Sequence, residues 1–287
     1  MTTLPDRVLT WYDQHARELP WRSESASAWS VLVSEFMLQQ TPVSRVLPVH
    51  QAWMARWPAP ADLAAAGVGD ALRAWGRLGY PRRALRLHAA ATAIVLEHCG
   101  DVPTSLKALR SLPGVGDYTA AAVASFAFGQ RHAVLDTNVR RVLARHRSGS
   151  AYPGSGVTVA ERRLAESLLP PSPARAARWG VAVMELGALV CTAAAPRCEA
   201  CPVAADCVWR LAGSPAHVGT RRRQAWTGTD RQCRGRLLAV LRDATGPVPR
   251  TLLEQVWPDA AQRDRCLASL VTDGLVAPVG DNLFALP

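Results

Sequence analysis

Apolar residues recur at intervals of three and four along most of this chain, from residue 4 to about residue 212. That spacing places them on one face of a helix, and short breaks containing Pro and Gly separate the segments. The alternation typical of strands is scarce. The pattern predicts helices over residues 29–38, 62–75, 82–98, 119–128, 139–145 and 175–190, with shorter ones over 105–109 and 136–142. We therefore predict an all-α first domain covering residues 1–212.

The rest of the chain divides into a basic segment and a small module. Residues 213–235 contain Gly, Pro and the run Arg221-Arg222-Arg223. They predict an exposed linker, which is either a solvated loop or an arm that follows phosphate groups. Residues 236–287 predict two helices followed by a hairpin. That order resembles a small α+β winged-helix module, although the linker and tail could equally cover the first domain.

Composition limits the partners of the chain. Its 287 residues are 49% apolar and 20% charged, which fits a folded globular protein. The net charge of +10 favours a polyanion such as nucleic acid over an acidic membrane surface. Nearly all basic residues are arginines, with Lys107 as the single lysine, a composition that a GC-rich genome also explains. Since neither a long apolar run nor a signal-peptide layout occurs, we expect a cytoplasmic protein.

Four of the seven cysteines form a cluster, C-x6-C-x2-C-x5-C, over residues 191–207. In a chain expected to stay in the cytoplasm, a metal centre is favoured over disulfides. A structural zinc and an iron–sulfur cluster are the candidates, and the unequal outer spacing favours iron–sulfur. The predicted ligands are Cys191, Cys198, Cys201 and Cys207.

A glycine-containing turn lies between two predicted helices in the string Leu112-Pro113-Gly114-Val115-Gly116-Asp117-Tyr118-Thr119. Its glycines allow a tight turn and let backbone N–H groups approach an anion near a helix N-terminus. A G-x-G pair alone marks only a turn, but the full string is typical of a helix-hairpin-helix, which grips a nucleic-acid backbone independently of sequence. We predict DNA contacts by Gly114, Val115 and Gly116.

An aspartate follows this turn in the string Val134-Leu135-Asp136-Thr137-Asn138-Val139. Asp136 either caps the helix after it or is a carboxylate kept ionised for chemistry. The sequence alone favours the cap, and the two roles can coexist.

The hairpin, the Leu135–Val139 string and the cysteines occur in the order found in the endonuclease III superfamily of DNA base-excision glycosylases, which the chain resembles over residues 19–209. The string Val33-Ser34-Glu35-Phe36-Met37-Leu38-Gln39-Gln40-Thr41 is similar to the signature of its adenine glycosylase (MutY) branch. Three other strings agree with that branch: Leu19-Pro20-Trp21-Arg22, Leu78-Gly79-Tyr80 and Met184-Glu185-Leu186-Gly187-Ala188.

The resemblance implies a fold, a cofactor and a reaction. The fold is an all-α, two-lobed helix-hairpin-helix unit, with DNA in the cleft between a six-helix barrel and a lobe whose cysteines hold a 4Fe-4S cluster. The reaction is hydrolysis of the N-glycosidic bond of adenine mispaired with 8-oxoguanine or guanine. The partner is double-stranded DNA with a mismatched or oxidised base pair, bound by a nucleoid-associated monomer that needs no membrane.

This reaction needs a proton on the leaving purine and stabilisation of an oxocarbenium cation, which two carboxylates in different environments can supply. Glu35 lies among apolar residues, so desolvation should keep it protonated, and by resemblance it protonates adenine at N7. N–H donors and the helix dipole should keep Asp136 ionised beside the sugar C1′. Tyr118 and Asn138 match family positions that order the nucleophile or the water around it.

By resemblance, further residues handle the flipped base. Gln40 and Tyr80 match the residues that wedge into the helix, and Gly79 lies beside Tyr80 in the same DNA-contacting string. The remaining matches are to the base pocket and flanking DNA contacts, namely Trp21, Arg22, Thr41 and Leu78. Packing in the core is nearly as good an explanation for Leu78 and Trp21.

Three departures from the family pattern bear on function. Tyr118 occupies the position of the lysine that forms a Schiff base in bifunctional members, so no lyase step is expected. Pro81 follows Tyr80 where a second tyrosine is common. Only about fifty residues follow the linker, without the Phe-Ser-His loop by which longer relatives read 8-oxoguanine. Two alternatives therefore stay open: a thymine/guanine mismatch glycosylase, and a non-catalytic DNA-binding redox sensor.

Overall fold

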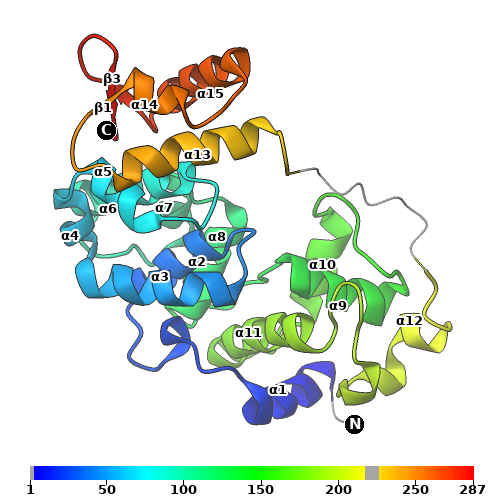
Figure 1. Cartoon of the computed structure of the whole chain (residues 1–287). Helices are drawn as coiled ribbons and strands as arrows, with labels where there is room; N and C mark the ends of the chain where they lie inside the picture. The colour runs from blue at the N-terminus through cyan, green and yellow to red at the C-terminus, as the bar shows by residue number, and fades with distance from the viewer. Residues whose placement is uncertain (1–2, 217–225) are drawn as a thin grey trace. The chain divides into compact units, whose positions relative to one another are not determined.

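The computed structural model describes residues 3–216 and 226–287, and helices dominate this part of the chain (Figure 1). Within it, the strands are three short ones near the C-terminus. The predicted fold class, all-α with a small C-terminal α+β module, is confirmed. The arginine run of the predicted linker, residues 221–223, lies outside the described residues. In the two described ranges, no helix is both long enough and apolar enough to cross a membrane.

The chain divides into two compact units, and each is described by itself. The first consists of residues 1–32, 104–111 and 115–220. Its α-helices are α1 (Leu4–His15), α7 (Leu106–Ser111), α8 (Asp117–Phe126), α9 (Thr137–Ser148), α10 (Val159–Ser167), α11 (Pro173–Leu189) and α12 (Val208–Leu211). Short 3-10 turns occur at η1 (Pro20–Arg22), η2 (Cys198–Ala200) and η3 (Ala204–Asp206). Helix α11 is central, because it packs against α1, α8 and α9 and buries Ala182, Val183 and Leu186 among them.

The second unit consists of residues 33–103, 112–114 and 221–287. It contains most of α2 (Ala28–Leu38), then α3 (Val43–Arg56), α4 (Pro60–Ala65), α5 (Val68–Trp75) and α6 (Arg82–Glu97). Helix α6 packs against α4 and α5, and α5 also packs against α3. Two fully buried indoles, Trp53 and Trp75, meet edge to face with ring centroids 5.8 Å apart in this core.

Two helix predictions needed correction. The segment predicted as one helix over residues 62–75 is two helices, α4 and α5, because Gly67 adopts an extended conformation between them and becomes the N-cap of α5. Helix α3 was not predicted, and Pro48 lies inside it. Proline usually ends a helix because it lacks an N–H donor, so tertiary packing has overridden a local signal here.

The C-terminal module begins with α13 (Asp230–Asp243) and continues through β1 (Val248–Pro249), α14 (Arg250–Glu254), α15 (Ala260–Thr272), β2 (Ala277–Pro278) and β3 (Leu283–Ala285). The strands form an antiparallel sheet in the order β1-β3-β2, with Val248 opposite Phe284 and Ala277 opposite Ala285. The predicted helix, helix, hairpin order is present, with α14 and the two-residue β1 added. The domain boundaries at residues 212 and 235 stay a prediction.

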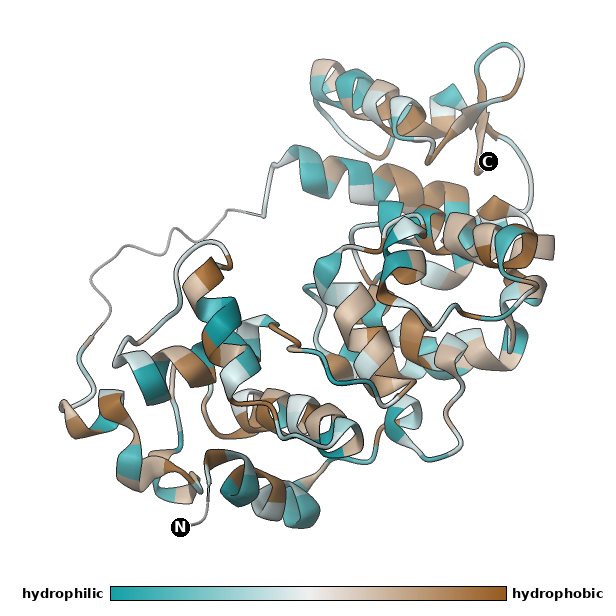
Figure 2. Cartoon of the chain, turned by 180° about the vertical axis from the view of Figure 1, so that it is seen from behind, coloured by the Kyte–Doolittle hydropathy of each residue, from teal (hydrophilic) through white to brown (hydrophobic). Residues whose placement is uncertain are grey.

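Helix α13 connects this module to the rest of the second unit. Its first turns are hydrophilic and its later turns hydrophobic, as Figure 2 shows for the helix that follows the grey trace. The apolar residues Leu237, Leu238 and Leu241 are buried, and α13 packs against both α5 and α15. The later turns of α13 therefore hold the helix in place, and most of the polar side chains at its beginning need not be buried.

Candidate active site

Helix α2 positions Glu35, the predicted acid. Phe36 and Met37, which follow Glu35 on this helix, are fully buried, and Glu35 itself is only 5% exposed. The burial expected for this side chain is thus present. Its role as the acid stays a prediction.

The end of α2 is held by Arg83, a residue that the sequence did not single out. Its guanidinium donates to the carbonyl oxygens of Phe36 at 2.8 Å and Met37 at 2.9 Å, and to that of Gln39 at 2.6 Å. It also donates to Thr41 Oγ1 at 3.0 Å and to the Gly79 carbonyl at 3.1 Å. Burial lowers the pKa of Arg83 to about 10. One buried cation therefore satisfies the last carbonyls of α2 and ties them to the loop before α6.

The two predicted wedge residues lie in the loops that Arg83 holds. Gln40 and Tyr80 both adopt left-handed backbone conformations, with φ of 55° and 47°. Non-glycine residues rarely occupy this region, and such residues cluster at functional sites. Gln40 is exposed and Tyr80 is 48% exposed, so both side chains are accessible.

The predicted pocket residues next to Gln40 and Tyr80 are mostly buried. Leu78 is 3% exposed, and Thr41 is 6% exposed and donates its hydroxyl to the Leu78 carbonyl at 3.3 Å. Their burial favours packing in the core for Leu78. Pro81 caps the beginning of α6 with φ of −61°, which suits its ring. The departure at Pro81 therefore fits the local structure.

The predicted hairpin turn depends on Gly114. Its φ is 81°, and a Cβ there would lie 2.7 Å from Arg86 Cβ and 2.9 Å from Phe36 Cε1, so only glycine fits. Gly116 differs, because its φ is −95° and no atom lies within 4 Å of where its Cβ would be. It is the N-cap of α8 and leaves open space beside the N-terminus of that helix. Val115 between them is buried.

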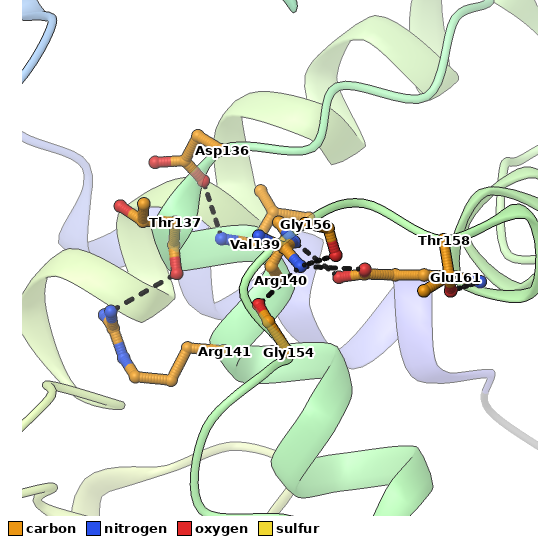
Figure 3. Close-up of polar contacts among 9 residues, drawn as sticks. All are labelled: Asp136, Thr137, Val139, Arg140, Arg141, Gly154, Gly156, Thr158 and Glu161. Atoms are coloured by element: carbon orange, nitrogen blue, oxygen red, sulfur yellow. Dashed lines mark hydrogen bonds and ion pairs between the residues drawn. The ribbon is translucent and has the colours of Figure 1, made fainter. Parts of the chain in front are cut away.

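Asp136 is the N-cap of α9, as the sequence favoured. Its Oδ1 accepts from the Val139 backbone N–H at 2.6 Å (Figure 3). Its Oδ2 accepts from Asn138 Nδ2 at 2.7 Å. Burial nevertheless raises the pKa of Asp136, and these hydrogen bonds only reduce that rise. The donors expected from the sequence are present, but the sequence did not show the burial that opposes them. That Asp136 stays ionised remains a prediction.

Two arginines of α9 tie the beginning of this helix to other parts of the first unit by hydrogen bonds. Arg140 donates to Glu161 Oε1 at 2.7 Å and to the Gly156 carbonyl at 2.7 Å (Figure 3). Arg141 Nη2 donates to Asn138 Oδ1 at 2.8 Å, and its Nε donates to the Cys191 carbonyl at 2.7 Å. Asn138 thus joins Asp136 to a chain of hydrogen bonds that ends at the first cysteine of the cluster.

Gly187 on α11 sets how closely this assembly packs. A Cβ there would lie 2.7 Å from Asn138 Cβ and 2.8 Å from the Asn138 carbonyl oxygen, and neither atom can swing away. Tyr118, the remaining predicted catalytic residue, lies half-buried in the first turn of α8. Asp136, Asn138 and Tyr118 belong to the first unit and Glu35 to the second.

We expect Gly187→Ala to lower the rate of base release by about 100-fold, because a displacement of roughly 1 Å at a reacting group costs this much. Stability should fall by about 1–3 kcal/mol from overpacking. Gly180→Ala on the same helix is the matched control, since the nearest atom to its Cβ would be in the Phe126 ring, at 3.3 Å. A Cβ at Gly180 would also meet Val134 Cγ2, at an ordinary contact distance of 3.9 Å. Single-turnover rates and melting temperatures of both variants check this, and equal rates for the two would contradict it.

The predicted base-pocket residues lie beside a buried ion pair. Trp21 is 6% exposed, and Arg22 Nη1 lies 2.9 Å from Glu185 Oε2. Arg17 Nε and Nη2 bind the two oxygens of the same carboxylate at 2.6 and 2.7 Å. Burial alone would raise the pKa of Glu185, but the two arginines outweigh it and the pKa lies below its usual value. The pairing fixes Arg22, and the burial of Trp21 agrees equally with packing in the core.

The four clustered cysteines line one pocket of the first unit, together with Arg145 and Trp209. Arg145 Nη1 lies 3.4 Å from Cys191 Sγ. Burial raises the pKa of Cys201 to about 11 and also raises that of Cys198. Of the side chains that the structure describes, no three from His, Cys, Asp and Glu are grouped so that they could hold a metal ion.

Two of the other cysteines make a contact that the sequence missed. Cys233 on α13 and Cys266 on α15 are both buried, and burial together with a hydrogen bond between them raises the pKa of Cys233 to about 12. Their thiols therefore stay protonated and serve as packing between the two helices. Cys99 is exposed.

The comparisons with known proteins agree with this geometry. Residues 33–167 match the model of the HhH-GPD superfamily base excision DNA repair protein. The chain belongs to this superfamily, as the resemblance predicted. It is 52% identical to the adenine DNA glycosylase of Mycolicibacterium smegmatis over 287 residues, which is 100% of this chain and 97% of that protein.

Two more distant relatives match about 72% of this chain. The chain is 43% identical to the human adenine DNA glycosylase over 216 residues, which is 72% of this chain and 39% of the human protein. The solved structure of a thermostable thymine-DNA glycosylase superimposes with a TM-score of 0.65 at 28% identity, covering 72% of this chain and 95% of that one.

Proposed function

We propose that this chain is a monofunctional adenine DNA glycosylase of base-excision repair, which acts as a monomer on duplex DNA. The observation that carries the proposal is the similarity over the full length of both chains to an adenine DNA glycosylase, tail included. The buried Glu35 and the N-capping Asp136 give this similarity a chemical basis. Because the similarity to the mycobacterial relative extends through residues 213–287, the short tail is a shared feature of the two proteins.

In the proposed reaction, the Glu35 carboxyl group donates its proton to N7 of adenine, which makes the base a better leaving group. The bond between N9 and C1′ then breaks. Asp136 stabilises the positive charge that develops at C1′, and water adds there with loss of a proton. Asn138, held by Arg141, keeps the Asp136 carboxylate in one orientation.

The substrate would be adenine opposite 8-oxoguanine or guanine. Release of free base from duplexes that pair adenine with 8-oxoguanine, guanine or thymine tests this directly, alongside a duplex with thymine opposite guanine. We expect fast release of adenine from the first two duplexes and none of thymine. Release of thymine alone would instead support the mismatch glycosylase, which the fold similarity to a thymine-DNA glycosylase keeps as the second candidate. Binding without release of any base would support the non-catalytic reading.

A lyase step is not expected, because Tyr118 stands where bifunctional relatives have a lysine. Lys107 lies exposed on α7, before the hairpin. Borohydride should therefore trap little or no covalent protein–DNA complex, and Lys107→Ala should leave trapping and base release unchanged. Strong trapping that Lys107→Ala abolishes would contradict this.

We further propose that Cys191, Cys198, Cys201 and Cys207 hold a 4Fe-4S cluster. Four thiols lining one pocket beside the cationic Arg145 fit a group that binds four thiolates and carries negative charge. When bound, the cluster would hold the loop of residues 191–207 in shape. No step of the reaction passes through it.

Cys198→Ser is expected to lower the iron and acid-labile sulfide content of the purified protein by at least half, and to lower its melting temperature. The exposed Cys99→Ser is the matched control and should retain both. One zinc per chain with no iron would favour the structural zinc site, and equal iron in the two variants would exclude Cys198 as a ligand.

A further inference from the structure

A wide groove lies within the second unit, between the loop of residues 76–82 and helix α13. Its volume is about 1250 Å³. One wall carries both predicted wedge residues, Gln40 and Tyr80, and the other is formed by the polar beginning of α13. The groove therefore joins the proposed DNA-contacting loops to the C-terminal module, whose role the sequence left open.

The groove is strongly basic. Nine of the residues that line it are arginines, whereas Asp273 is the one acidic residue in the described lining. Asp273 pairs with Arg82 at 3.4 Å and with Arg234 at 2.5 Å. In the described chain, no carboxylate lies within ion-pair distance of the exposed lining arginines that remain, namely Arg45, Arg77, Arg86, Arg231 and Arg236.

Such a concentration of like charge is unfavourable unless an anion is bound. Arginine forks suit the paired oxygens of phosphate groups. A single phosphate would engage only two or three of these side chains, while the lining extends over an open groove. The size and charge of the groove therefore fit a polyanion.

An exposed aromatic side chain accompanies the arginines. Trp226 lies just before α13 and is 53% exposed. The Arg231 guanidinium lies 5.2 Å from the centroid of its ring. Arginines interleaved with an exposed aromatic ring are typical of nucleic-acid binding surfaces, where the ring packs on a sugar or a base.

We propose that helix α13 is a second DNA-contacting element, and that this groove holds backbone phosphates of the same duplex whose base stack Gln40 and Tyr80 enter. This inference rests on the proposed function. It assigns the short C-terminal module a role as one wall of the DNA-binding surface, with Arg231 on that wall and Arg77 on the opposite loop as phosphate contacts. Both side chains are exposed, so their replacement by alanine should leave the fold intact.

The test measures the binding of a fully paired DNA duplex as a function of salt by fluorescence anisotropy. The full chain is used with Arg231→Ala, Arg77→Ala and the double variant. Arg265→Ala is the matched control, because Arg265 is exposed in the same module, pairs with Asp230 and lies outside the groove. All single variants lose the same one charge.

Each groove variant should weaken binding by about tenfold and flatten the slope of log affinity against log salt by about 0.9, the value for one lost phosphate contact. The double variant should flatten it by roughly 1.8. Arg265→Ala should stay within about twofold of the wild type in affinity.

Slopes of the groove variants equal to that of Arg265→Ala would overturn the inference, as would weakened binding of single strands with unchanged binding of duplex. Adenine release by the wild-type chain, measured in parallel, keeps the two levels distinct. If release is normal and the slopes are unchanged, only the role of α13 fails. If the wild type releases no base, the proposed function itself fails.

Discussion

Replacing Asp136 by asparagine is expected to lower the single-turnover rate of adenine release by about 1000-fold, because the carboxylate that stabilises charge at C1′ is lost. Asparagine remains a good N-cap and can still accept from the Val139 N–H, so α9 should form normally. Asp281→Asn, which removes a carboxylate from the exposed turn of the C-terminal hairpin, is the control and should not change the rate. A rate for Asp136→Asn within tenfold of the wild type would exclude Asp136 from the chemistry.

The same variant should also change how stability depends on pH. The pKa of Asp136 is raised in the folded protein, so Asp136 binds a proton more tightly in the folded state than in the unfolded state. That preference stabilises the fold below the ordinary aspartate pKa and is lost as pH rises through the raised value. Asparagine cannot ionise, so the melting temperature of the variant minus that of the wild type should increase between about pH 4 and pH 7. A difference that is constant or falls over this range would contradict the burial of an ionisable group here.

Replacing Arg83 by methionine should destabilise the protein by about 3–5 kcal/mol, because the buried carbonyl oxygens that accept from its guanidinium would be left without a donor. For a chain of this size, that lowers the melting temperature by roughly 10 °C. The carbonyls of Phe36, Met37 and Gln39 would lose their shared donor, and with it the fixed conformations of Gln40 and Tyr80. Binding to duplex DNA should weaken as well.

Arg82→Met is the control for this prediction, since Arg82 precedes Arg83 on α6 but forms only an exposed ion pair with Asp273. Exposed pairs contribute at most about 1 kcal/mol. Equal melting temperatures for the two variants would show that the Arg83 hydrogen bonds do not hold the end of α2.

Much of the site could be predicted because its signals are local. The N-cap at Asp136, the positive φ at Gly114 and the clustering of four cysteines each depend on residues close together in the chain. Chemistry of this kind is set by residue type and spacing, which the sequence displays directly. The apolar segments that form α2, α6, α8 and α11 were visible for the same reason.

The rest depends on contacts between distant residues. Arg83 donates to atoms 44 to 47 positions away at the end of α2, and Arg141 reaches Cys191 across 50 positions. Nothing in the sequence around these two arginines distinguishes them from the many arginines on the surface of this chain. The raised pKa of Asp136 likewise comes from tertiary burial, and the position of α13 opposite the wedge loop comes from packing of Leu237 and Leu241. No local pattern carries that information.

The central claim is that a buried glutamate protonates an adenine in duplex DNA. Single-turnover release of adenine opposite 8-oxoguanine by the wild type and by Glu35→Gln tests it most directly, with binding of the duplex measured for both. Glutamine keeps the shape of a side chain that is only 5% exposed, so the fold should be retained. We expect release by the wild type, a rate about 100- to 10,000-fold lower in the variant, and equal binding. Release at the wild-type rate by Glu35→Gln, or no release by a wild-type chain that binds the duplex, would contradict it.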